Sequence, residues 1–143
     1  MIIENKPSIG LNGETCIGST PEEIDEIISA TGVPFCLDIG HAICAANAHG
    51  VDPIEFLRDF LQRAPLMFHL TDGDWHSKRD SHLHFGEGNY PLDAILELLP
   101  RDARVTNEAR RLDGSSLREV SADVEALAAL VSRSSLSAGR IKA

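Results

Sequence analysis

Short apolar runs that alternate with capped amphipathic segments are the feature of this sequence that most constrains its fold. The apolar runs predict strands at residues 1–4, 33–38, 66–72 and 103–108. The amphipathic segments predict helices at residues 20–32, 52–65, 90–100 and 116–132. Strands that alternate with helices in this way are typical of parallel sheets with right-handed crossovers. The sequence therefore predicts an α/β fold of about four βα units.

Two of the expected helices carry clear start signals. Thr20 and Glu23 form a capping box around Pro21, and Asp52 is expected to cap the next helix ahead of another proline. The Ser- and Ala-rich stretch at residues 133–143 has no such signal, and we expect a flexible tail there. The last helix is expected to turn one apolar stripe toward the core, namely Leu117, Val120, Val124, Leu127, Leu130 and Val131.

Charge and composition narrow the classes of function. The net charge of −9 argues against a nucleic-acid-binding face, which is normally basic, although bound cations can neutralise acidic clusters. No apolar run approaches the roughly 18 residues that a membrane span needs, and no basic signal segment precedes the first run. The cysteines at positions 16, 36 and 44 lack metal-binding CxxC spacing, so we expect free thiols in a reducing cytoplasm.

Acidic and imidazole side chains stand at the ends of the expected strands. Glu4, Asp38 and Glu108 close three of the apolar runs, and His69 lies near the end of the remaining one. The carboxyl ends of parallel strands share one face, so these side chains should converge there. A single such residue is usually a helix cap or a solvated loop residue, but all four together favour a site for Mn²⁺, Zn²⁺ or Mg²⁺. We call these residues the acidic quartet.

A second group of candidate ligands comes from two other segments. Asp80 and His82 stand in the stretch RDSHLHFGEG, and His41 follows Asp38 by three residues. Together His41, Asp80 and His82 offer donors that suit Zn²⁺, and we call them the histidine set. The residues alone are equally compatible with surface loop histidines and an aspartate that caps a turn.

The order of several motifs resembles a known superfamily. IIEN, CLDIGHA, FHLTDGD, RDSHLHFGEG and TNEA are similar to segments of the xylose-isomerase-like (AP endonuclease family 2) superfamily, which includes endonuclease IV and many sugar isomerases and epimerases. This resemblance covers residues 1–110 and implies a (β/α)₈ barrel. A complete barrel needs about 250 residues, and this sequence begins at what resembles the fifth strand. We therefore expect residues 1–132 to form the C-terminal half of such a barrel, and a second copy to cover its open sheet.

The resemblance also implies roles for the candidate residues. In the isomerases and epimerases, the equivalents of the acidic quartet hold a divalent metal, and Glu4 and Glu108 match the pair that exchanges a proton beside a carbonyl. His41 matches a histidine that contacts substrate in those relatives. In endonuclease IV, the equivalents of the histidine set hold a further zinc ion. His84 has no counterpart.

Three functions follow as expectations. The first is a divalent-metal-dependent isomerase or epimerase that acts on a small sugar or sugar phosphate, which the acidity of the chain favours. The second is an endonuclease IV-like zinc phosphodiesterase acting on abasic DNA, which Asp80 and His82 favour. The third is a catalytically silent half-barrel that serves as an assembly module, because activity is expected to need the missing N-terminal half or a second copy.

Overall fold

A parallel sheet of four strands, in the order β1-β2-β3-β4, forms the centre of the protein. The computed structural model describes residues 1–111 and 117–139. Its strands are β1 (Ile3–Glu4), β2 (Phe35–Asp38), β3 (Met67–His69) and β4 (Val105–Thr106). Each strand pairs in parallel with the next, which confirms the predicted α/β architecture, although every strand is shorter than its apolar run.

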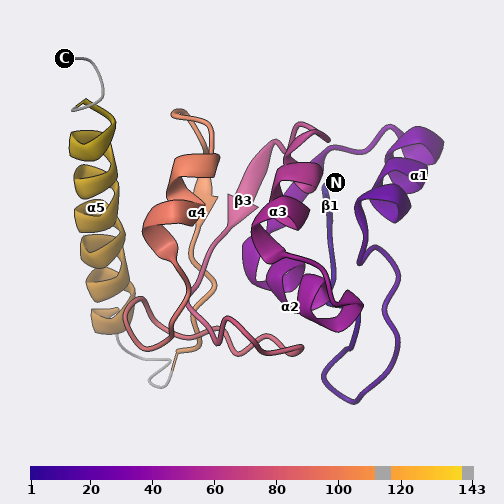
Figure 1. The fold of residues 1–143 in the computed structure, drawn as a ribbon, viewed down its shortest axis with the longest axis horizontal. Helices are drawn as coiled ribbons and strands as arrows, with labels where there is room; N and C mark the ends of the chain where they lie inside the picture. The colour runs from indigo at the N-terminus through magenta and orange to yellow at the C-terminus, as the bar shows by residue number, and fades with distance from the viewer. Residues whose placement is uncertain (112–116, 140–143) are drawn as a thin grey trace.

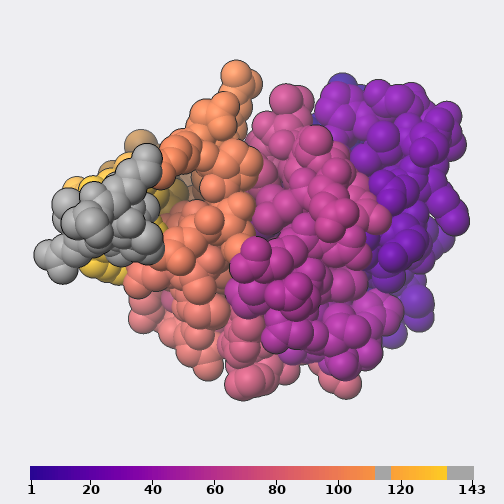
Figure 2. All heavy atoms as spheres, turned by 45° about the horizontal axis from the view of Figure 1, so that its top comes forward, coloured from indigo at the N-terminus to yellow at the C-terminus, as the bar shows by residue number. Residues whose placement is uncertain are grey.

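Helices connect and flank these strands. They are α1 (Pro21–Thr31), α2 (Ile39–His49), α3 (Pro53–Leu61), α4 (Leu92–Leu98) and α5 (Arg118–Gly139). Figure 1 shows α1 at one end of the molecule and α5 at the other. In the space-filling view of Figure 2, the colours follow one another across the molecule from the N-terminal side to the C-terminal side. The predicted capping box is present, with Thr20 and Glu23 bonded reciprocally. Among the described residues, no helix is long and apolar enough to cross a membrane.

Helix α2 is a feature that sequence patterning did not predict. It begins directly after β2, and Asp38 caps it because the Asp38 carboxylate accepts a hydrogen bond from His41 N at 2.8 Å. Residues 39–46 are all buried, so the segment lacks the polar face that reveals an amphipathic helix. This helix places His41 on its first turn, beside the end of β2.

Helix α5 differs from its prediction in length and in orientation. It continues to Gly139, beyond the expected end at residue 132. Leu130 is buried and Leu127 packs against the core, but other members of the predicted core stripe are exposed, namely Leu117, Val120, Val124 and Val131. α5 lies at one end of the molecule, where it packs against α4 (Figure 1).

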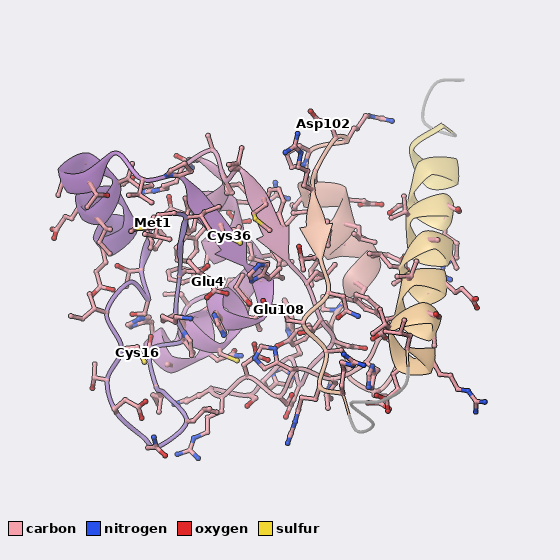
Figure 3. All side chains as sticks on the ribbon, turned by 180° about the vertical axis from the view of Figure 1, so that it is seen from behind. Met1, Glu4, Cys16, Cys36, Asp102 and Glu108 are labelled. Carbon is pink, nitrogen blue, oxygen red and sulfur yellow. The ribbon has the colours of Figure 1, made fainter. Side chains whose placement is uncertain are left out.

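The strand register separates the sheet into two faces. Leu37 pairs with Phe68, and Phe68 with Val105, so these side chains point to the same side, where Leu37 and Phe68 are buried in the core. Asp38 pairs with His69 and lies on the opposite side. Figure 3, turned to the back of the view in Figure 1, shows this opposite face toward the reader. The strands lie in front of α2, and Glu4 and Glu108 lie near the strand ends. The apolar core and the acidic residues therefore occupy different faces of one sheet.

We propose that a second copy of the chain covers the sheet face that carries the acidic residues, together with the exposed side of α5. Open sheet edges and apolar patches favour such association. Light scattering at micromolar concentration should then give a mass near twice the 15.5 kDa of one chain. Val124→Lys should shift the protein toward monomer, since Val124 is 60% exposed and its replacement adds a charge without disturbing the core. A monodisperse wild-type monomer with a cooperative melt and no binding of a hydrophobic dye would contradict this proposal.

Candidate metal centre

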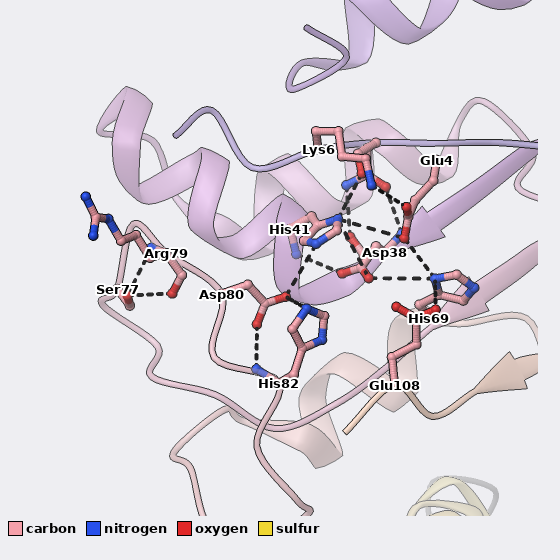
Figure 4. A network of polar contacts seen from close by, with 11 residues as sticks. Glu4, Lys6, Asp38, His41, His69, Ser77, Arg79, Asp80, His82 and Glu108 are labelled. Atoms are coloured by element: carbon pink, nitrogen blue, oxygen red, sulfur yellow. Dashed lines mark hydrogen bonds and ion pairs between the residues drawn. The ribbon is translucent and has the colours of Figure 1, made fainter. Parts of the chain in front are cut away.

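The acidic quartet is assembled around one imidazole nitrogen. His69 Nδ1 lies 2.9 Å from Glu4 Oε1, 3.2 Å from Glu108 Oε1 and 3.8 Å from Asp38 Oδ2 (Figure 4). One donor atom from each of the four side chains lies within 4.8 Å of the others. Glu4, Asp38 and His69 are the last residues of β1, β2 and β3, whereas Glu108 lies just beyond the end of β4. The sequence prediction that these side chains converge is therefore confirmed.

Asp38 carries the strongest electrostatic cost in this group. Burial raises the pKa of its carboxyl group to about 7, and the negative charges of Asp80 and Glu4 add to the effect. Burial also opposes ionisation of Glu4, but hydrogen bonds from Lys6 and His69 outweigh it and hold the pKa of Glu4 below its ordinary value. A divalent cation placed among these oxygens would relieve the repulsion, so the donor set fits a hard or borderline ion.

The histidine set lies next to the quartet. His41 Nε2 and His82 Nε2 each lie 3.7 Å from Asp80 Oδ2, which is too long for a hydrogen bond. Asp80 Oδ2 is buried and has no hydrogen-bond partner among the described residues. Gly40 permits its approach to α2, because a Cβ atom there would lie only 2.6 Å from this oxygen. A buried carboxylate oxygen between two imidazoles is an arrangement that fits Zn²⁺.

His41 connects the two groups, and Asn5 positions it. The Asn5 carbonyl oxygen lies 2.9 Å from His41 Nδ1, a contact that makes Nδ1 the donor and leaves the lone pair of Nε2 toward Asp80. The fully buried Asn5 side chain donates to Asp38 O at 2.9 Å and accepts from Asp38 N at 2.7 Å. Asn5 thus extends the pairing of β1 and β2 by one amide and fixes Asp38. Sequence reasoning gave Asn5 no role, although its place directly after Glu4 was visible.

Asp72 organises the loop that carries Asp80 and His82. Its carboxylate accepts hydrogen bonds from the backbone N–H groups of residues 73, 86, 88 and 90. Gly88 lies against residue 73 so closely that a Cβ atom would be 2.3 Å from its carbonyl oxygen. His82 has a φ of +47°, a conformation that is strained for a residue with a side chain. The His82 N–H donates to Asp80 Oδ1 at 3.1 Å, and this bond helps to hold the strained residue.

A lysine and two buried cysteines also have defined electrostatic states. Lys6 Nζ lies 2.6 Å from Glu4 Oε2, on the opposite carboxylate oxygen from the one that contacts His69. Burial and the neighbouring carboxylates raise the pKa of the Cys36 thiol to about 12, and burial raises that of Cys44 to about 12 as well. Both thiols therefore stay protonated near neutral pH. All three cysteines are free, as predicted.

Comparisons with known proteins agree with this architecture. The family model described as xylose isomerase-like TIM barrel matches residues 2–127. An uncharacterized protein of Methanocaldococcus jannaschii is 33% identical over 100 residues, which are 68% of this chain and 31% of that protein. The crystal structure of a D-tagatose 3-epimerase-like protein matches with a TM-score of 0.68 and 23% identity, over 94% of this chain and 48% of the other. The chain thus spans under a third of the first relative and about half of the second, and the second likeness shows the fold alone.

The raised pKa of Asp38 predicts a pH-dependent stability cost in the metal-free protein. The folded pKa of about 7 exceeds the ordinary value of 3.8, so folding binds a proton between these values. The contribution of Asp38 to stability is therefore fully present below pH 3.8 and is lost as pH rises through 7. Asp38→Asn cannot ionise and still caps α2, so at pH 8 in EDTA it should be more stable than wild type by ~1–3 kcal/mol.

Denaturant unfolding at pH 5 and pH 8 measures this difference, and millimolar Mn²⁺ should reverse the order by stabilising wild type alone. Asp52→Asn is the matched control, because it removes a charge from another helix cap that lies outside the metal centre. Equal stability of Asp38→Asn and wild type in EDTA at both pH values would show that Asp38 carries no such cost.

Proposed function

The chain belongs to the xylose isomerase-like TIM barrel family, and we propose that it serves in the divalent-metal-dependent isomerisation or epimerisation of a small sugar or sugar phosphate. The likeness to a D-tagatose 3-epimerase-like protein supports this class of substrate. Because the chain spans about half of that structure, we propose that the active unit needs a completing half, from a second copy or from further chain.

The observation that carries this proposal is the convergence of three carboxylates on His69 Nδ1 at the open face of the sheet. Glu4, Asp38 and Glu108 contribute more negative charge than His69 and Lys6 can balance, and Asp38 is only 5% exposed. Acidic clusters of this kind are costly unless a cation joins them. The quartet is therefore the set of residues that would hold Mn²⁺, Zn²⁺ or Mg²⁺.

When bound, a divalent ion would polarise a carbonyl or hydroxyl oxygen of the sugar. The residues of this chain supply the rest of the chemistry. Glu108 has a side chain that is 37% exposed, so it can reach a substrate carbon and exchange a proton there. Glu4, with a side chain 22% exposed, would serve as the partner carboxylate in that exchange. His41 would orient a substrate oxygen through Nε2, since Asn5 already occupies its Nδ1.

A second candidate function is zinc-dependent phosphodiester hydrolysis. The histidine set favours it, because Asp80 Oδ2 is buried without a partner between two imidazoles that suit zinc. Clustered zinc ions can activate water and stabilise a leaving oxygen. The net charge of −9 opposes the approach of a polyanion such as abasic DNA, so we rank this function second.

Wild type should retain at least one divalent ion per chain after dialysis against metal-free buffer. Asp38→Ala and Glu108→Ala should each lose it, because each removes one direct ligand and one charge from the quartet. Elemental analysis of the dialysed proteins measures the content. Asp93→Ala serves as the control, since Asp93 is an exposed carboxylate on α4 and should not affect the ion. If wild type and both quartet variants all lack metal, the metal proposal is refuted.

The histidine set separates the two candidate functions. For an isomerase or epimerase, Asp80→Ala and His82→Ala should leave one tightly bound ion in place. For a phosphodiesterase, wild type should hold two or more zinc ions and lose one in these variants. We expect a single tight ion and no cleavage of abasic DNA. Zinc stoichiometry above one, together with cleavage that Asp80→Ala abolishes, would establish the second function instead.

A further inference from the structure

Helix α5 buries a carboxylate on its inner face while it leaves valines outside. Asp123 is 3% exposed and lies on the same side of the helix as Leu127 and Leu130, at spacings of four and seven residues. Val120 and Val124, in contrast, are exposed. Burial of a carboxylate in place of an available valine is costly unless the carboxylate is fully hydrogen-bonded. The orientation of α5 therefore indicates that the contacts of Asp123 outweigh this cost.

Asp123 contacts two segments that are distant in sequence. Its Oδ2 lies 2.7 Å from His84 Nδ1 and 2.7 Å from Asn107 Nδ2, and its Oδ1 accepts from Phe85 N at 3.1 Å. His84 and Phe85 follow His82 in the loop between β3 and α4, whereas Asn107 directly precedes Glu108. One buried carboxylate thus joins the loop of the histidine set to the segment that carries a quartet ligand.

Both segments lie beyond the ends of the strands, where the hydrogen bonds of the sheet no longer fix the backbone. β4 ends at Thr106, so the ladder does not fix Glu108. Asn107 Oδ1 accepts from Ala109 N at 2.8 Å, which bends the backbone around Glu108. Arg110 N donates to His82 O at 2.8 Å, so the two segments also touch directly, at the residue with the strained φ of +47°.

From these contacts we propose that Asp123 is a positioning residue that sets Glu108 through Asn107 and the loop of His82 through His84 and Phe85. Among the described residues, its hydrogen bonds go to His84, Phe85 and Asn107 and to no candidate ligand. This inference rests on the proposed function for its metal readout, but not for its structural readout. It also gives a role to His84, the histidine of RDSHLHFGEG that no counterpart explained.

The test compares four variants by two measurements. Calorimetric titration with Mn²⁺ gives the affinity of the quartet, and hydrogen exchange in EDTA reports the order of residues 80–88 and 105–111 separately. Asp123→Ala should weaken Mn²⁺ binding about tenfold, the lower end of what outer contacts to metal ligands contribute. It should also speed exchange in both segments. Glu125→Ala, which removes an exposed carboxylate from the same helix, should change neither measurement.

Asn107→Ala and His84→Ala each remove one of the two connections that Asp123 makes. Together they separate positioning from general destabilisation. Asn107→Ala should weaken Mn²⁺ binding and speed exchange in residues 105–111, while residues 80–88 stay protected. His84→Ala should speed exchange in residues 80–88 and leave Mn²⁺ affinity within about twofold of wild type, a change of about 0.4 kcal/mol. These two variants decide the matter if Asp123→Ala does not fold.

Two results would overturn the inference. One is a folded Asp123→Ala with wild-type exchange in both segments and unchanged Mn²⁺ affinity. The other is an equal response of both segments to Asn107→Ala and to His84→Ala, which would mean that the cluster stabilises the domain as a whole. A wild type that binds no Mn²⁺ would refute the proposed function, and hydrogen exchange would still decide whether Asp123 positions the two segments.

Discussion

The repulsion among carboxylates at the open face is the constraint on which the rest of this structure depends. Asp38 stands at its centre, because the same residue ends β2, caps α2 and contributes an oxygen to the quartet. Each of these roles keeps its carboxylate in a fixed and buried place. Burial then raises its pKa to about 7, so the metal-free fold holds a charge that it solvates poorly.

Side chains substitute for missing backbone pairs around this centre. The sheet strands are short, and they end at or just before the candidate ligands. Beyond those ends, Asn5 continues the pairing of β1 and β2, and Asp72 gathers four backbone N–H groups of the following loop. From α5, Asp123 binds the backbone N–H of Phe85 and the side chains of His84 and Asn107. These hydrogen bonds restrain the segments that carry the candidate ligands.

Sequence patterns located the strands and the candidate ligands, because both depend on local rules. An apolar run that ends in a charged residue marks a strand end, and the proline-containing caps at Thr20 and Asp52 mark helix starts. Sequence patterns did not predict helix α2, because its residues 39–46 are all buried and it has no polar face to produce a periodic pattern. They also did not predict which face α5 turns to the core. That face includes Asp123, whose hydrogen-bond partners lie at sequence separations of 16 to 39 residues. Such long-range hydrogen bonds leave no trace in a local pattern.

The contact between Lys6 and Glu4 bears on the coordination sphere of a bound ion. Lys6 Nζ lies 2.6 Å from Glu4 Oε2, whereas Glu4 Oε1 lies 2.9 Å from His69 Nδ1. Glu4 would therefore bind an ion in monodentate fashion, since the second oxygen is already engaged by an ammonium group. By engaging one oxygen of Glu4, Lys6 would limit the number of quartet oxygens available to an ion, and a substrate oxygen would then have room beside it.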